Sequence, residues 1–149
     1  MKKIYFSLLV FILTNTVWAQ EIVIVNPKEI NGDTVPFAVI EDVPVFPGCE
    51  EIERKERFNC FQAKINNHIK SNFIYPKKAL KRKIEGRVSV HYTINEEGII
   101  EDIQTTGGDP ILQTEALRIM LLLPKMEPGK LRGRPVKCKH VVPITFKLQ

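Results

Sequence analysis

The stretch YPKKALKRKIEGRVSVHYTINEEGIIEDIQTT, residues 75–106, decides the fold. From Arg87 to Ile94 apolar and polar residues alternate, and a period of two is typical of a strand with one buried face. Asn95 to Gly98 predicts a hairpin loop in which glycine supplies a positive φ, and Ile99 to Thr106 is the returning strand. Residues 77–83 predict a short basic helix before the hairpin. The segment therefore indicates a small antiparallel sheet.

The C-terminal run VKCKHVVPITFKLQ, residues 136–149, predicts a further strand. Because proline has no N–H, Pro143 predicts an edge strand or a bulge, and lysines on an edge discourage unwanted pairing. A long edge strand can also accept an extended peptide. The predicted inward face consists of Val136, Cys138, His140, Val142, Ile144, Phe146 and Leu148. The predicted outward face consists of Lys137, Lys139, Val141, Pro143, Thr145 and Lys147. Residues 136–147 are thus the candidate peptide-binding residues.

Two longer helices complete the pattern. One is predicted within residues 50–73, with Asn59 as its cap and an apolar stripe at every fourth residue. That stripe consists of Phe61, Ile65, Ile69 and Phe73. The second helix is predicted to begin at Asp109 and Pro110, because an N-cap followed by proline is typical of a helix start. We expect its apolar face to lie on the apolar side of the hairpin.

The N-terminal residues predict export. Lys2 and Lys3 precede the apolar run from Ile4 to Leu13, and Ala19 ends a suitable cleavage site. We interpret residues 1–19 as a signal peptide; the alternative is a short uncleaved membrane anchor, although a span needs about 20 apolar residues. Residues 20–58 contain many prolines and predict an extended arm with a turn-rich segment.

Three cysteines remain beyond the signal peptide, and an exported chain enters an oxidising compartment. Cys49 and Cys60 flank one polar segment and are the predicted disulfide pair. Such a bridge stabilises a fold by about 2–4 kcal/mol. Cys138 falls in the strand pattern, where a buried small apolar residue is expected.

The chain has a net charge of +5, with basic segments at 64–87 and 125–147. Basic patches can bind nucleic acid, but an exported protein meets little of it, so acidic lipid, cell wall or an acidic protein segment are the expected partners. No GxSxG or HExxH motif occurs. His68, His91 and His140 lie in separate predicted elements, so neither a metal nor a cofactor is predicted. The sequence favours a binding module over an exported enzyme.

Several short motifs occur in a fixed order over residues 59–149. They are Tyr75-Pro76, the G-x-V-x-V strand from Gly86, the hairpin ending at Gly98, the turn Met126-Glu127-Pro128-Gly129, and Pro143-Ile144 before Phe146. In this order they resemble the TonB C-terminal domain family. The resemblance implies an α+β fold, with a three-stranded antiparallel sheet and helices packed on one face. It also implies a periplasmic, non-enzymatic protein.

The resemblance further implies partners. Outer-membrane transporters of TonB-dependent, energy-coupled transport would add a short segment as a strand beside the last strand. The ExbB–ExbD motor would be a partner if the leader remains as an anchor. The chain lacks the long proline-rich spacer of classical members, and its cysteine pair is not one of their features. The alternative is an envelope-associated structural protein that binds peptidoglycan through exposed cations of the short basic helix. These cations are Lys77, Lys78, Lys81, Arg82 and Lys83.

Overall fold

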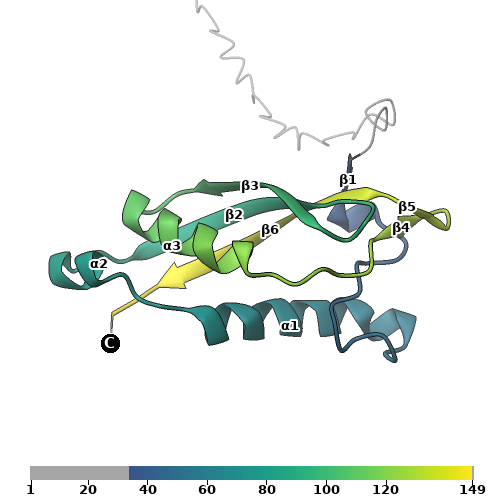
Figure 1. Ribbon diagram of the computed structural model, residues 1–149, viewed down its shortest axis with the longest axis horizontal. Coiled ribbons are helices and arrows are strands. Elements are labelled where there is room, and N and C mark those ends of the chain that lie inside the picture. The colour runs from purple at the N-terminus through teal and green to yellow at the C-terminus, as the bar shows by residue number, and fades with distance from the viewer. Residues whose placement is uncertain (1–33, 149) are drawn as a thin grey trace, which may run out of the picture.

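The computed structural model describes residues 34–148, and the predicted signal peptide lies outside these residues (Figure 1). Within this range no helix is long and apolar enough to cross a bilayer. The elements, in chain order, are β1 (Thr34–Pro36), η2 (Phe37–Val39), η3 (Arg54–Glu56), α1 (Arg57–Asn72), α2 (Lys77–Arg82), β2 (Gly86–Ile94), β3 (Ile100–Thr106), α3 (Pro110–Leu121), β4 (Lys130–Leu131), β5 (Arg134–Pro135) and β6 (Lys137–Phe146).

The main sheet has the strand order β1-β6-β2-β3. The predicted hairpin is confirmed as the antiparallel pair β2–β3, and the predicted last strand is confirmed as β6, antiparallel to β2. A three-stranded sheet was expected, whereas β1 adds a fourth strand, parallel to β6. The apolar run Val35–Ile40 in the arm is compatible with one strand, but β1 has only three residues, one of them proline, in a segment rich in breakers, so its pairing with β6 could not be foreseen.

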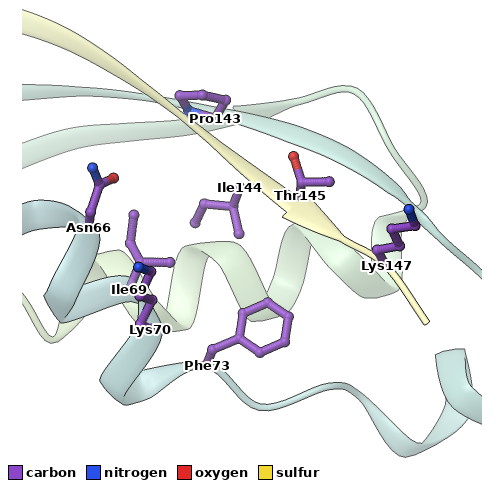
Figure 2. Close-up of a pocket in the computed structure, with 8 residues that line it drawn as sticks. All are labelled: Asn66, Ile69, Lys70, Phe73, Pro143, Ile144, Thr145 and Lys147. Atoms are coloured by element: carbon purple, nitrogen blue, oxygen red, sulfur yellow. The ribbon is translucent and has the colours of Figure 1, made fainter. Parts of the chain in front are cut away.

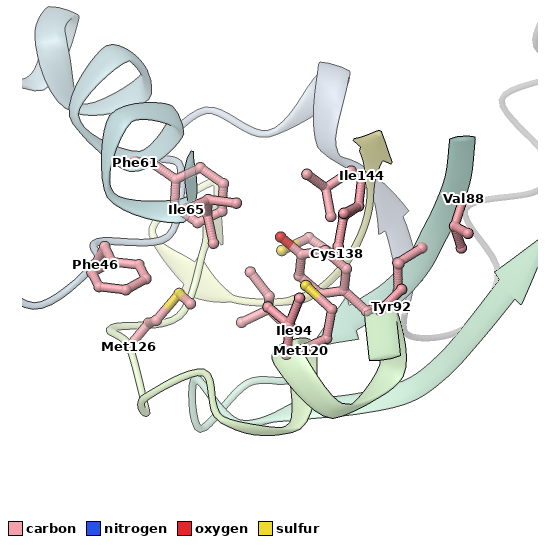
Figure 3. Close-up of a cluster of buried hydrophobic side chains, with 14 of the residues drawn as sticks. Phe46, Phe61, Ile65, Val88, Tyr92, Ile94, Met120, Met126, Cys138 and Ile144 are labelled. Atoms are coloured by element: carbon pink, nitrogen blue, oxygen red, sulfur yellow. The ribbon is translucent and has the colours of Figure 1, made fainter. Parts of the chain in front are cut away.

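One hydrophobic core fills the space between the sheet and the helices. The alternation predicted for residues 87–94 is confirmed at Val88, Val90, Tyr92 and Ile94, which are buried in the core, whereas Thr93 was predicted to face outward and is also buried. Figure 3 shows these side chains converging from both helices and both long strands. The completely buried members include Phe61, Ile65, Val88, Val90, Ile94, Leu112, Ala116, Ile119, Met120 and Cys138. The helices therefore cover one face of the sheet, as expected for the α+β class.

The predicted N-cap is confirmed for α3 and is wrong for α1. Asp109 caps α3, because its carboxylate accepts a hydrogen bond from Ile111 N at 2.8 Å. Asn59 was predicted to cap the first helix, and this is wrong. Helix α1 begins earlier, after Glu56, and the Asn59 amide donates to Glu56 Oε2 at 3.0 Å from within the first turn.

The predicted disulfide is confirmed. Cys49 and Cys60 are bonded, with their Cα atoms 6.1 Å apart, and the bridge ties the segment before α1 to the helix itself. Cys138 is a free thiol that is completely buried, as predicted. Burial raises the pKa of Cys138 to about 12, so this thiol stays protonated at neutral pH.

Candidate functional site

The outer edge of β6 is only partly covered by other strands. β1 pairs with Lys137 to Lys139, so these three residues lie between two strands and not on a free edge. Val136 precedes β6, and its N–H is bonded to Gly129 O at 3.0 Å. Within residues 34–148 no strand pairs with this side of β6 beyond Lys139. The structure therefore narrows the candidate peptide-binding edge to residues 141–147.

Two prolines indicate which main-chain groups face this edge. Pro36 has no N–H, so the parallel pairing around Val35 has to use the main-chain groups of Lys137 and Lys139. Along a regular strand the main-chain N–H and C=O groups of successive residues point to opposite edges. The main-chain groups of Val141, Pro143 and Thr145 therefore face the same edge as those of Lys137 and Lys139. This orientation also explains why Pro143 is tolerated, since its missing N–H leaves the β2–β6 ladder intact.

A groove runs along the free edge, between α1 and the end of β6. It has a volume of about 390 Å³ and opens toward solvent. The lining residues are Asn66, Ile69, Lys70 and Phe73 from α1 and its C-terminal end, and Pro143, Ile144, Thr145 and Lys147 from the strand side; Figure 2 shows Ile144 directed toward Ile69 and Phe73. Ile144 is buried, and Ile69 and Phe73 are half-buried, so the floor is apolar. The groove can therefore receive an apolar side chain of an added strand.

The helical wall of the groove is fixed in place by α3. Arg118 Nη2 donates to Asn72 O at 2.5 Å, at the end of α1. Glu115 accepts from Ile74 N at 3.0 Å and pairs with Arg118 at 2.6 Å. The aromatic ring of Phe73 packs on the ring of Phe146, with a centroid distance of 5.1 Å. The groove is thus a preformed feature of the fold.

Positive charge lines the groove. Lys70 and Lys147 are exposed on opposite walls, and none of the eight lining residues carries a carboxylate. Glu85 lies just beyond the strand end, where its carboxylate accepts from Leu148 N. The electrostatics therefore favour an acidic residue in a bound strand, at a strength reduced by salt because both lysines are exposed.

His140 lies at the other end of the edge and is part of a polar network. Its Nδ1 is 2.9 Å from the Tyr92 hydroxyl and its Nε2 is 3.2 Å from Gln62 Nε2. The ring also packs on Phe37 and Phe61, with centroid distances of 4.5 and 5.5 Å. Burial lowers the pKa of His140 from 6.5 to about 4. The neutral ring holds strand and helix together, and nothing in this arrangement activates it for catalysis.

This burial predicts an acid-sensitive fold. The pKa of His140 in the folded state lies below its value in the unfolded state. Neutral His140 therefore contributes its full share to the free energy of unfolding above pH 6.5, and this share is lost as the pH falls toward 4. We expect the free energy of unfolding to fall by up to about 3 kcal/mol across this window because of His140 alone. Urea titrations of the wild type and of His140→Gln at several pH values measure the difference. Equal pH dependence in both proteins would contradict the assignment.

The other histidines do not join His140. His68 Nε2 donates to Ile119 O at 2.9 Å, and His91 Nε2 lies 3.2 Å from the Thr106 hydroxyl. Each is therefore bound to a different neighbour, and within residues 34–148 no group of His, Cys, Asp and Glu is arranged to hold a metal ion.

The motif residues outside β6 support turns and loops of the fold. The Tyr75 hydroxyl donates to Ile84 O at 2.7 Å and so closes the segment around α2. Gly98 has a φ of +80° and lies against the main chain of Met126. Gly129 is buried beside Ile40 and Asp42. These residues shape the loops that support β6. The five cations of the basic helix are exposed at α2 and its end.

Sequence reasoning missed the helical half of the groove. Ile69 and Phe73 were predicted only as core residues, and Asn66 and Lys70 were not singled out. The apolar stripe of α1 is the signal that was available. It does not reveal that its last turns stand beside an unpaired strand edge, because this depends on how distant segments pack.

Comparisons with known proteins place this geometry in a family context. A family model described as "Gram-negative bacterial TonB protein C-terminal" matches residues 71–148. Two curated relatives, each named Protein TonB and from different strains of Helicobacter pylori, are 34% identical over 92 residues, or 61% of this chain. The matched region spans 31% and 32% of those relatives, so this chain corresponds to about a third of their length.

A solved structure supports the same relationship. The NMR solution structure of the Helicobacter pylori TonB-CTD has a TM-score of 0.50 and 29% sequence identity, and the match covers 67% of this chain and 87% of that one. The family model begins at residue 71, so β1, η2, the disulfide and most of α1 precede its match.

Proposed function

This chain belongs to the family of Gram-negative bacterial TonB C-terminal domains, and on that premise we propose that it binds an extended segment of an outer-membrane transporter. The segment adds to the sheet as a strand on the free edge of β6. The observation that carries the proposal is the unpaired edge beside the groove of α1, at residues 141–147.

Main-chain hydrogen bonds supply affinity for the added strand. The edge offers the carbonyl groups of Val141, Pro143 and Thr145, together with the N–H groups of Val141 and Thr145. Side chains then set preference, because alternate residues of the added strand point to opposite faces of the sheet. One set enters the apolar groove over Ile69 and Phe73.

The proposed setting is the periplasm, in energy-coupled transport. An export signal at residues 1–19 would bring the chain there, and a retained anchor would make the ExbB–ExbD motor a further partner. We propose no enzymatic activity and no cofactor, since the site offers only pairing groups, apolar contacts and surface charge.

A binding comparison tests the proposal. Full-length protein is titrated with the dye-labelled periplasmic segment of a TonB-dependent transporter from the same bacterium, and separately incubated with purified peptidoglycan. We expect saturable binding of the segment and no retention on peptidoglycan. Retention on peptidoglycan without binding of the segment would overturn the proposal and favour a cell-wall role for the cations of α2.

A further inference from the structure

The segment before α1 lies across one end of the candidate site. β1 occupies the outer side of Lys137 to Lys139, and η2 follows directly beside β6. Figure 1 shows this segment next to the start of β6, while the C-terminal end of that strand is uncovered. The family match begins at residue 71, so this covering segment precedes the matched residues.

Phe37 of η2 closes the interval between α1 and β6. Its ring lies 4.5 Å from the His140 ring on β6, and 5.2 and 6.1 Å from the rings of Phe61 and Phe58 on α1. The groove is lined by later residues of the same two elements, beginning at Asn66 and Pro143. Phe37 therefore stands between α1 and β6 before the first residues that line the groove, at the end opposite Lys147.

The covering segment is held firmly on both sides of Phe37. Val35 of β1 is 7% exposed. After η2, Asp42 and Val45 form main-chain bridges to Lys130 and Glu127. The disulfide at Cys49 then joins the segment to α1. A bound strand would have to break several contacts to displace it.

We propose that β1 and Phe37 act as a stop that limits the length and fixes the register of the bound strand. This inference rests on the proposed function. The partner that fits is an extended acidic peptide that pairs with residues 141–147 only, about 20 Å of edge at the usual rise of a strand. Its far end meets Phe37, and an acidic side chain near the open end meets Lys70 and Lys147.

Peptides of graded length test the stop. The probes are dye-labelled, end-blocked peptides of alternating glutamate and valine, which lengthen by one residue pair at a time. For the wild-type full chain we expect affinity to rise with length until the peptide spans residues 141–147, and then to stay constant. A continued rise of about five-fold per added pair, the upper range for cross-strand pairs, would overturn the stop.

A variant moves the stop. Val35→Asp with Phe37→Ala should release β1 and open the edge at Lys137 to His140. In this variant we expect the longer peptides to gain about five-fold per added pair, while the shorter ones bind as before. Val39→Ala is the matched control, because Val39 is 53% exposed in the same segment and should leave the length limit unchanged.

These measurements distinguish failure of strand binding from failure of the stop. If neither the transporter segment nor a peptide of any length binds the wild type, the proposed function fails and the stop fails with it. If peptides bind but the wild type shows no limit, or the folded double variant keeps the wild-type limit, only the stop fails. Circular dichroism and the intact disulfide establish that the variant is folded.

Discussion

Replacing Thr145 by proline is expected to lower the affinity for an added strand by about 5- to 150-fold, because a carbonyl of that strand loses its N–H donor, which costs about 1–3 kcal/mol. Thr145 is exposed. Its N–H faces the free edge, because Lys137 and Lys139 pair with β1 on this side of β6 and every second residue after them points its main-chain groups the same way. The substitution removes this donor and places a ring where the partner strand must approach. Titration with the transporter segment or with an alternating glutamate–valine peptide measures the loss.

The fold should survive Thr145→Pro. The β2–β6 ladder uses the even-numbered residues of β6 by the same alternation, and Pro143 already occupies an equivalent position two residues earlier. Thr145→Ala is the matched control, since it removes the side chain but keeps the N–H, and it should bind within about two-fold of the wild type. Equal affinities of the proline and alanine variants would contradict strand addition at this edge.

Gly98→Ala is expected to destabilise the protein by roughly 3 kcal/mol or more, the range of backbone clashes at special φ values. A Cβ at Gly98 would lie 1.7 Å from Met126 O, and the residue has a φ of +80°. The hairpin loop and the loop after α3 are also hydrogen-bonded at this point, because Met126 N donates to Gly98 O at 2.9 Å. Relief of the clash requires the hairpin and the loop that carries the Val45 bridge to separate.

Gly133→Ala provides the control for this effect. Gly133 has a similar φ of +73°, but nothing lies within 4 Å of a Cβ placed there. Only the left-handed conformation is penalised, at about 1–2 kcal/mol. Denaturant unfolding of both variants measures the two values. A Gly98→Ala loss no larger than that of Gly133→Ala would show that the hairpin does not depend on this close approach.

The hairpin and the last strand were predictable because their signals are local. Alternation over residues 87–94 requires only that one face be buried, and the turn at Gly98 requires a positive φ. The cap at Asp109 likewise depends on neighbouring residues alone. The pair Cys49 and Cys60 followed from its short separation and from the expected export.

The groove and the stop were not predictable, because each depends on contacts between distant segments. Phe37 carries no periodic signal, and its place between Phe61 and His140 arises only once α1 lies beside β6. β1 is too short to show alternation. The whole of residues 136–147 could therefore be assigned as an edge, although β1 covers part of it.

Residue-resolved amide hydrogen exchange, with and without saturating peptide, tests strand addition at β6 most directly. We expect the peptide to slow exchange at Val141 and Thr145, whose N–H groups face the free edge. Exchange at Val142, Ile144 and Phe146 should change little, since these amides already face β2. Slowed exchange confined to α2 or to β3, without the alternating change along β6, would contradict the account.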